Sequence, residues 1–219
     1  MNTVQKLLDA SKDIWDAYNE HPFVLGIQNG TLSRDKFRFY IIQDYLYLMD
    51  YAKSFAVGIA KAKSAKTANL FAKYIAVMNG ELNVHSGYMG RLGITEDEVR
   101  RSKPSLDNLS YTSYMLRVAY DDGEAEILAA ILSCAYSYEV IAKKMLAAAP
   151  DCVNDAFYGD WIRDYASQRY SDDNTLLLDT LNELTRDYTP AQLEHLAEIF
   201  VVCSRYELAF WEMSWNMKM

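Results

Sequence analysis

Apolar residues recur every three or four positions along almost the whole chain, which is the spacing of one face of an α-helix. Between residues 35 and 63, one such face is formed by Phe39, Ile42, Leu46, Met49 and Ala56. The pattern therefore predicts a protein built of amphipathic α-helices.

Capping residues and helix breakers divide this pattern into separate helices. Thr95 and Glu98 have the spacing of a capping box, and Pro190 follows an N-cap at Thr189 with Gln192 at the third helical position. A short helix is expected to begin at Thr95. The other helices are expected at residues 4–18, 35–63, 65–92, 109–120, 124–149, 156–168, 174–186 and 190–217.

The composition supports long helices with few connections. Among 219 residues there are only 9 glycines and 4 prolines, about half the usual share of these turn-forming residues. Apolar residues make up 51% of the chain, enough for one substantial core. Because the chain contains no internal repeat, low-complexity tract or linker, we expect an all-α, single-domain helical bundle of seven to nine helices over residues 1–219.

Charge and cysteine usage exclude several kinds of partner. The net charge is −8, and no basic stripe of the kind that binds nucleic acid is present. The N-terminus lacks the apolar region of a signal peptide, and no apolar run approaches the roughly 18 residues of a membrane span. The three cysteines do not form a disulfide framework. We therefore expect a cytoplasmic protein with no nucleic-acid or membrane partner.

Cys134 and Glu207 are candidates for chemistry. Cys134 lies in the most apolar predicted helix, where Tyr138 shares its face. Taken alone, a cysteine in this setting is more often a packing residue than a nucleophile. Glu207 is flanked at helical spacing by Cys203 and aromatic residues, where burial would raise the pKa of a carboxyl group. Proton transfer by Glu207 and pairing with a base such as Arg205 remain alternatives.

Asp44 also interrupts an aromatic stripe, because Tyr40 and Tyr47 lie on the same helical face. The chain has 17 tyrosines, and many of them cluster near these acids. Aromatic rings with a few carboxylates fit a flat, neutral or cationic heteroaromatic ligand, although such stripes are more often plain core. Cys152 and Cys203 are interpreted as bystanders.

A metal centre is the competing interpretation of a helical bundle. Glu81 and His85 share the spacing of two ligands on one helical face. A di-iron site needs repeated Glu-x-x-His units, and His21 and His195 lie outside any second pair. We therefore expect no metal, with His85 in a structural role.

Five segments, in order along the chain, resemble the TenA/thiaminase-2 family. They are FYIIQDYLY at residues 39–47, YTSYM at 111–115, AEILAAILSCAYSYE at 125–139, WIRDY at 161–165 and YELAFW at 206–211. The resemblance implies a haem-oxygenase-like helical bundle, a homotetramer and no cofactor. Ser133 and Ala135 depart from the family, which often has proline before the cysteine and bulkier aromatics after it. This departure affects the expected shape of the pocket.

The resemblance also implies a role for each matching residue. Cys134 falls on the family nucleophile, Glu207 on its acid–base glutamate, and Asp44 on the carboxylate that holds the pyrimidine. Four tyrosines fall on positions that stack on the ring or hydrogen-bond around it, namely Tyr47, Tyr111, Tyr138 and Tyr165.

The implied activity is thiamin salvage. The expected enzyme hydrolyses 4-amino-5-aminomethyl-2-methylpyrimidine to its 5-hydroxymethyl counterpart, or hydrolyses thiamin itself. The alternatives are a non-catalytic pyrimidine-binding or regulatory protein and, with less support, a haem or di-iron oxidase.

Overall fold

The computed structural model describes residues 2–219, apart from the side chains of residues 77–85. All regular structure in the described part of the chain is helical, as predicted. In chain order the helices are α1 (Thr3–Glu20), α2 (Pro22–Gln28), α3 (Arg34–Lys61), α4 (Ala65–Leu92), α5 (Glu96–Arg101), α6 (Leu106–Asp121), α7 (Glu124–Ala148), the 3-10 helix η1 (Pro150–Asn154), α8 (Gly159–Tyr165), α9 (Gln168–Leu184) and α10 (Pro190–Asn216).

The predicted helix caps are confirmed. The Thr95 hydroxyl accepts a hydrogen bond from the backbone N–H of Glu98 at the start of α5. Thr189 and Gln192 form the reciprocal capping box of α10. Gly93 ends α4 with a φ of 64°, a left-handed conformation that glycine adopts at little cost.

The regions around α2 and α8 differ most from the prediction. The helix α2 was not predicted, and its first turn is capped by the His21 side chain. The prediction of a single helix at residues 156–168 is wrong. The Asp155 carboxylate accepts hydrogen bonds from the backbone N–H groups of Phe157 and Tyr158 and holds a turn there. The short α8 follows this turn. An N-cap at Ser167 then starts α9 at Gln168 rather than at residue 174.

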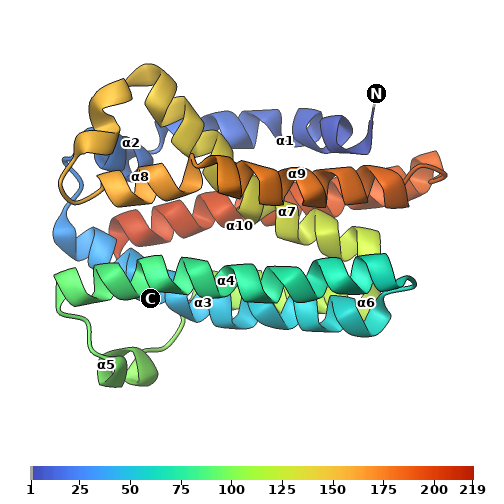
Figure 1. The fold of residues 1–219 in the computed structure, drawn as a ribbon, viewed down its shortest axis with the longest axis horizontal. Helices are drawn as coiled ribbons and strands as arrows, with labels where there is room; N and C mark the ends of the chain where they lie inside the picture. The colour runs from blue at the N-terminus through green and yellow to red at the C-terminus, as the bar shows by residue number, and fades with distance from the viewer. Residues whose placement is uncertain (1) are drawn as a thin grey trace.

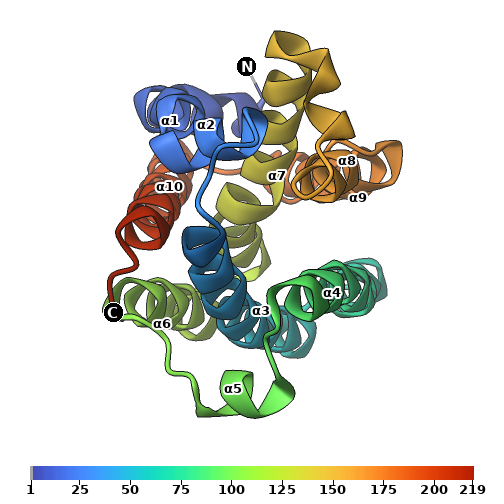
Figure 2. The ribbon, with the colours of Figure 1, turned by 90° about the vertical axis from the view of Figure 1, so that its left-hand side faces the viewer.

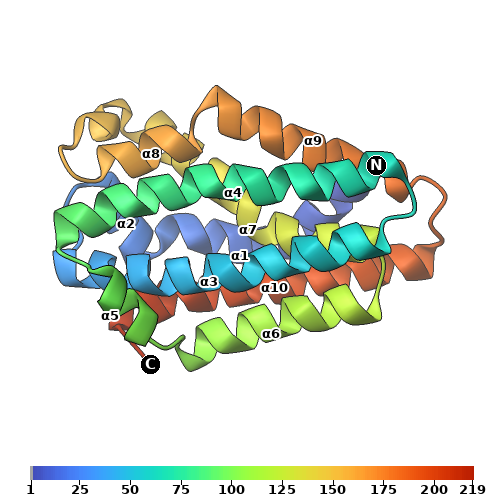
Figure 3. The ribbon, with the colours of Figure 1, turned by 60° about the horizontal axis from the view of Figure 1, so that its bottom comes forward.

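The long helices run along one common direction (Figure 1). Viewed end-on, α7 occupies the centre, with the other long helices around it (Figure 2). It contacts α1, α3, α6, α8, α9 and α10. Figure 3 shows α3, α10 and α6 side by side, with the small α5 at one end. A helix that is apolar on all sides must be covered on all sides, which explains why α7 is central.

By length and composition alone, α7 is apolar enough to cross a membrane, which corrects the expectation that no segment approaches this length. Of its most apolar 18-residue window, 78% is buried inside the protein. Such burial is typical of a core helix.

Candidate active site

Five helices bring the seven predicted site residues into one cluster. Cys134 and Tyr138 lie on α7, Glu207 on α10, Asp44 and Tyr47 on α3, Tyr111 on α6 and Tyr165 on α8. The ring centroids of Tyr47 and Tyr111 are 5.2 Å apart, and those of Tyr138 and Tyr165 are 4.8 Å apart. Glu207 and Cys134 act electrostatically on Tyr47, Tyr111 and Tyr138. Both ring pairs therefore lie near the candidate chemical groups.

Cys134 is the most accessible of the three thiols. It is partly exposed, whereas Cys152 and Cys203 are buried. The Cys134 thiol also interacts with the carboxyl group of Glu207. Cys152 is part of η1. Cys203 lies one turn before Glu207 on α10 and hydrogen-bonds Ser133, so it borders the cluster.

Glu207 is only 2% exposed. The pKa of Glu207 is raised to about 8, and burial is the largest cause. The nearby charge of Asp44 also raises this pKa, whereas hydrogen bonding with Tyr111 and Cys134 lowers it. The Oε2 atom has no hydrogen-bond partner among the described residues. A carboxyl group with its pKa raised this far can exchange a proton near neutral pH.

Asp44 lies near Tyr40, which was not among the predicted site residues. Burial and the charge of Asp44 raise the pKa of Tyr40, one turn earlier on α3. The Tyr40 hydroxyl lies 3.4 Å from that of Tyr138 and accepts a 3.3 Å hydrogen bond from the indole N–H of Trp161. The helical spacing of Tyr40 and Asp44 was visible in the sequence, whereas the contact with Trp161 was not.

Trp211 is a further member of the cluster. Its ring stacks on Tyr40, with centroids 5.8 Å apart, and lies 5.2 Å from the ring of Tyr138. Its buried Nε1 has no hydrogen-bond partner in the described part of the chain. Because Trp211 lies one turn after Glu207 on α10, the same helical face presents a carboxyl group and an indole N–H. These groups can hold a flat ring by stacking and by hydrogen bonds at its edge.

Hydrogen bonds from α9 hold the stretch of α7 around Cys134. The carbonyl oxygen of Ala135 accepts from the Tyr170 hydroxyl at 3.0 Å and from the Asn174 amide at 3.1 Å. Asn174 also donates to the buried carboxylate of Glu139 at 2.7 Å. A rigid backbone at this position fixes where the Cys134 thiol points.

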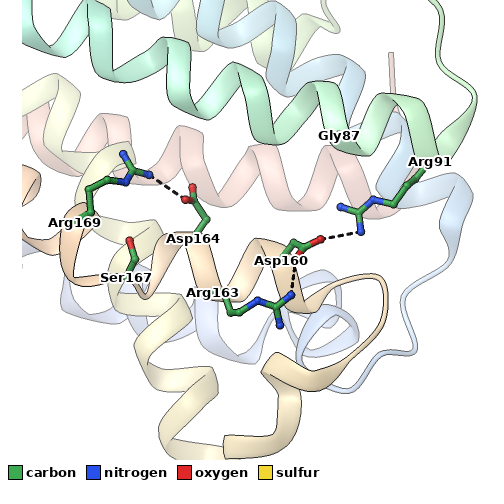
Figure 4. A pocket seen from close by; sticks show the side chains of 7 residues that line it. All are labelled: Gly87, Arg91, Asp160, Arg163, Asp164, Ser167 and Arg169. Atoms are coloured by element: carbon green, nitrogen blue, oxygen red, sulfur yellow. Dashed lines mark hydrogen bonds and ion pairs between the residues drawn. The ribbon is translucent and has the colours of Figure 1, made fainter.

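A charged surface cleft of about 440 Å³ lies between α4, α8 and α9 and is lined by none of the predicted site residues (Figure 4). Asp160 pairs with Arg163 and with Arg91 of α4, the latter at 3.0 Å. Arg169 pairs with Asp164 at 3.0 Å. The cleft is lined by Gly87, Arg91, Asp160, Arg163, Asp164, Ser167 and Arg169. These ion pairs tie the outer face of α8 to its neighbours.

The predicted metal ligands do not form a described site. Glu81 and His85 lie outside the residues whose side chains are described. Elsewhere in the described chain, no group of three or more histidine, cysteine or acidic side chains could hold a metal. His21 contacts Glu212 at 3.1 Å and His195 contacts Asp122 at 3.0 Å, both remote in sequence.

The sequence profile of the TENA/THI-4/PQQC family matches residues 8–217. An aminopyrimidine aminohydrolase of Helicobacter pylori is 42% identical over 217 residues, which cover 99% of this chain and 100% of that protein. This chain belongs to the TENA/THI-4/PQQC family. An aminopyrimidine aminohydrolase of Halalkalibacterium halodurans is 38% identical over 220 residues, covering 100% of this chain and 98% of that one.

Solved structures agree with this family membership. A TenA homologue from P. horikoshii OT3 superimposes with a TM-score of 0.86 at 31% identity, covering 99% of both chains. Heme oxygenase-1 from Synechocystis sp. PCC6803 has a TM-score of 0.65 at 15% identity, covering 99% of this chain and 94% of that one, which concerns the fold alone. The predicted family and haem-oxygenase-like fold are thus confirmed.

Proposed function

We propose that this protein is a thiamin-salvage hydrolase, an aminopyrimidine aminohydrolase that uses Cys134 as its nucleophile. The observation that carries the proposal is the meeting of Cys134, Glu207 and Asp44, from three helices, beside one cluster of aromatic rings. Relatives 42% and 38% identical over essentially the whole chain bear the name aminopyrimidine aminohydrolase. The substrates we propose are 4-amino-5-aminomethyl-2-methylpyrimidine, thiamin, or both.

The reaction replaces the group on the methylene carbon attached to the pyrimidine ring by a hydroxyl group. The Cys134 thiolate adds to a ring carbon next to the substituted one, and the electrons of the ring then expel the leaving group, which is ammonia from a protonated aminomethyl group or the neutral thiazole from thiamin. Water adds to the exocyclic methylene that results and loses one proton to solvent, and the thiolate departs. Covalent catalysis of this kind divides one difficult displacement into easier steps. Water is the second substrate, and we propose that no cofactor takes part.

Glu207 supplies and recovers the proton in this scheme. It protonates a ring nitrogen while the thiolate attacks, and it takes the proton back when the thiolate leaves. Its pKa of about 8 suits both steps near neutral pH. The unpartnered Oε2 atom offers a position for the ring nitrogen, because a buried carboxylate oxygen without a hydrogen bond is costly.

The remaining residues bind the ring. Asp44 holds the amino and ring-nitrogen side of the pyrimidine through charge-assisted hydrogen bonds. Tyr47, Tyr111, Tyr138 and Tyr165 stack on the ring or hydrogen-bond around it. The closely spaced rings of Tyr138 and Tyr165, with centroids 4.8 Å apart, support this assignment.

We further propose that the enzyme is a cytoplasmic homotetramer. The three cysteines are free, which fits a reducing compartment. The assembly follows from the family resemblance, and light scattering on the purified protein measures it. A monomer at micromolar concentration would contradict the tetramer.

The deciding experiment compares kcat/KM of the purified protein on thiamin and on 4-amino-5-aminomethyl-2-methylpyrimidine, with Cys134→Ser beside it. We expect hydrolysis of at least one substrate by the wild type and none by Cys134→Ser, which should still fold and bind the pyrimidine. Equal turnover by the variant would overturn the role of Cys134. Tight pyrimidine binding without turnover by the wild type would favour a binding or regulatory protein instead, and haem colour or stoichiometric iron would favour an oxidase.

A further inference from the structure

A buried amide pair joins α3 to the start of α6 directly beside Asp44. Gln43 is 2% exposed and Asn108 is 0% exposed. The side-chain amide of Asn108 donates to the backbone carbonyl oxygen of Gln43 at 2.8 Å and to its side-chain oxygen at 3.0 Å. That backbone carbonyl belongs to the peptide group that joins Gln43 to Asp44. Asn108 therefore contacts the backbone of α3 right next to a predicted ring-binding carboxylate.

The side chain of Gln43 also binds the segment that leads into α6. Its oxygen accepts from the backbone N–H of Ser105 at 2.9 Å, and its nitrogen donates to the carbonyl oxygen of Lys103 at 3.1 Å. Four hydrogen bonds thus connect Gln43 to the start of α6. Hydrogen bonds are directional, whereas apolar contacts are not, so this set fixes both the rotation and the height of one helix against the other.

The partners of the Asn108 amide determine its orientation. Its nitrogen faces two oxygen atoms of Gln43 that only accept, so the reverse orientation would place three acceptors together. Its own oxygen is buried and has no hydrogen-bond partner in the described part of the chain. An unpaired buried oxygen costs free energy that a leucine of similar size would not. A polar group kept in the core at this cost fits a contact that specifies one arrangement of the helices.

Two aromatic rings of the site lie one turn further along these helices. Tyr47 follows Gln43 by four residues on α3, and Tyr111 follows Asn108 by three residues on α6. Their ring centroids are 5.2 Å apart. Because the geometry of one helical turn is fixed, the contact between Gln43 and Asn108 sets where the two rings meet.

Further polar contacts between α3 and α6 allow more movement. The Tyr47 hydroxyl lies 3.6 Å from the sulfur of Met115, which is a weak acceptor. At the far end of α3, the Lys61 ammonium group donates to the carbonyl oxygens of Tyr120 and Asp122. A lysine side chain is flexible and can follow a shift of its acceptors. The buried amide pair is therefore the contact that holds the two rings in place.

We propose that Gln43 and Asn108 are positioning residues whose contact sets the spacing of the ring-binding side chains of α3 and α6. The inference rests on the proposed function, in which those side chains, Asp44, Tyr47 and Tyr111, hold the pyrimidine. None of the four hydrogen bonds of Gln43 involves α7 or α10, so the nucleophile and the acid–base group stay in place when the pair is lost.

The test compares wild type with Asn108→Ala by fluorine NMR and by calorimetry. Protein labelled with fluorotyrosine reports the surroundings of each ring, and Tyr47→Phe and Tyr111→Phe identify the two resonances. Both resonances should shift in Asn108→Ala, because rings that move change the shift of their neighbours. The Kd of the hydroxymethylpyrimidine product should rise about 10-fold, since the ring-binding groups are no longer correctly spaced.

Two further measurements separate positioning from a general loosening of the site. The rate at which iodoacetamide modifies Cys134 should match that of wild type, whereas a loosened core would expose the thiol and raise the rate. Asn108→Leu fills the volume with apolar atoms but still lacks the donor. It should therefore change the fluorine shifts and the Kd as Asn108→Ala does, and it takes the place of that variant if circular dichroism shows Asn108→Ala to be unfolded.

Thr185→Ala is the matched control. The buried Thr185 hydroxyl lies 2.6 Å from that of Thr3 and joins the end of α9 to α1. These two helices carry none of the predicted site residues. The variant loses a buried contact between helices, as Asn108→Ala does, but it should leave the two fluorine resonances and the Kd unchanged.

Unchanged fluorine shifts or an unchanged Kd in the Asn108 variants would overturn the proposal, as would equal changes in Thr185→Ala. Changes in Asn108→Ala but not in a folded Asn108→Leu would assign the effect to a cavity, and faster modification of Cys134 would assign it to loosening; either result contradicts positioning. A wild type that neither binds nor hydrolyses the pyrimidines would refute the proposed function, while the fluorine shifts would still decide whether the amide pair places the rings.

Discussion

The carboxyl group of Glu207 on α10 interacts with the thiol of Cys134 on α7. A nucleophile and an acid–base group must lie close together to serve one reacting ring. The contact depends on the packing of α10 against α7, and a rigid α7 is therefore part of the proposed site.

Glu207→Gln should lower kcat by roughly 100- to 10,000-fold, because it removes the group that moves the proton and leaves the ring contacts intact. KM should change by no more than a few-fold. Steady-state kinetics on the aminomethylpyrimidine measure both. Glu212→Gln is the control, since Glu212 is exposed on the same helix and pairs with His21. A rise in KM alone would rule out proton transfer by Glu207.

The same carboxyl group should make stability depend on pH. The pKa of Glu207 is raised from 4.5 to about 8 in the folded protein, so the unfolded chain loses this proton first. Its stabilising contribution is fully present below pH 4.5 and is lost as the pH rises to about 8. The free energy of unfolding of wild type relative to Glu207→Gln should fall by about 5 kcal/mol across this range. Urea denaturation at several pH values measures it, and parallel pH profiles would contradict it.

Asp44→Asn should weaken pyrimidine binding about 10- to 100-fold, because a hydrogen bond to a charged group is replaced by one to a neutral amide. Calorimetry with the hydroxymethylpyrimidine product gives the Kd. The control is Asp50→Asn on the same helix, where the carboxylate pairs with Lys53 instead. Equal affinity in wild type and Asp44→Asn would show that Asp44 does not hold the ring.

Iodoacetamide should modify one of the three thiols in the folded protein. Cys134 is partly exposed, whereas Cys152 and Cys203 are buried. Mass spectrometry should locate the adduct on Cys134, and the pyrimidine should slow its formation. Cys134→Ser should show no fast reaction. Modification of Cys152 at the same rate, or no protection by pyrimidine, would argue against a substrate site at Cys134.

Asn174→Ala should destabilise the protein by about 1–3 kcal/mol, because it leaves the buried Glu139 carboxylate and the Ala135 carbonyl without their shared donor. Chemical denaturation measures the loss. Thr175→Ala is the neighbouring control, since its exposed hydroxyl bonds only within α9 and its loss should cost less than about 0.5 kcal/mol. Equal stabilities would mean that Asn174 does not contribute to holding this part of α7.

Local patterns were enough to predict the helices and several of their ends. Periodicity located α1, α3, α4, α6, α7 and α10, because a helix buries one face every three or four residues. Capping at Thr95 and Thr189 depends on residues only three positions apart, so the sequence alone revealed it. The same locality explains why Glu207 stood out, since its apolar neighbours lie on its own helix.

The predicted helix boundaries were wrong where a side chain hydrogen-bonds to a nearby backbone group and starts or ends a helix that the apolar spacing would continue. The Asp155 carboxylate turns the chain before α8, and Ser167 starts α9 early. Both residues are common in many kinds of turn, and the apolar spacing around them does not distinguish a turn from a helix.

By itself, the sequence determined the helical class, most helix boundaries and the candidate side chains of each helix. Only the tertiary structure decided which of these side chains meet. Trp161 reaches Tyr40 and Ser133 reaches Tyr111 because α8 and α7 pack against other helices at particular angles and heights. Periodicity specifies the buried face of a helix but not the residue that it faces, since that contact is set by the packing of side chains from distant parts of the chain.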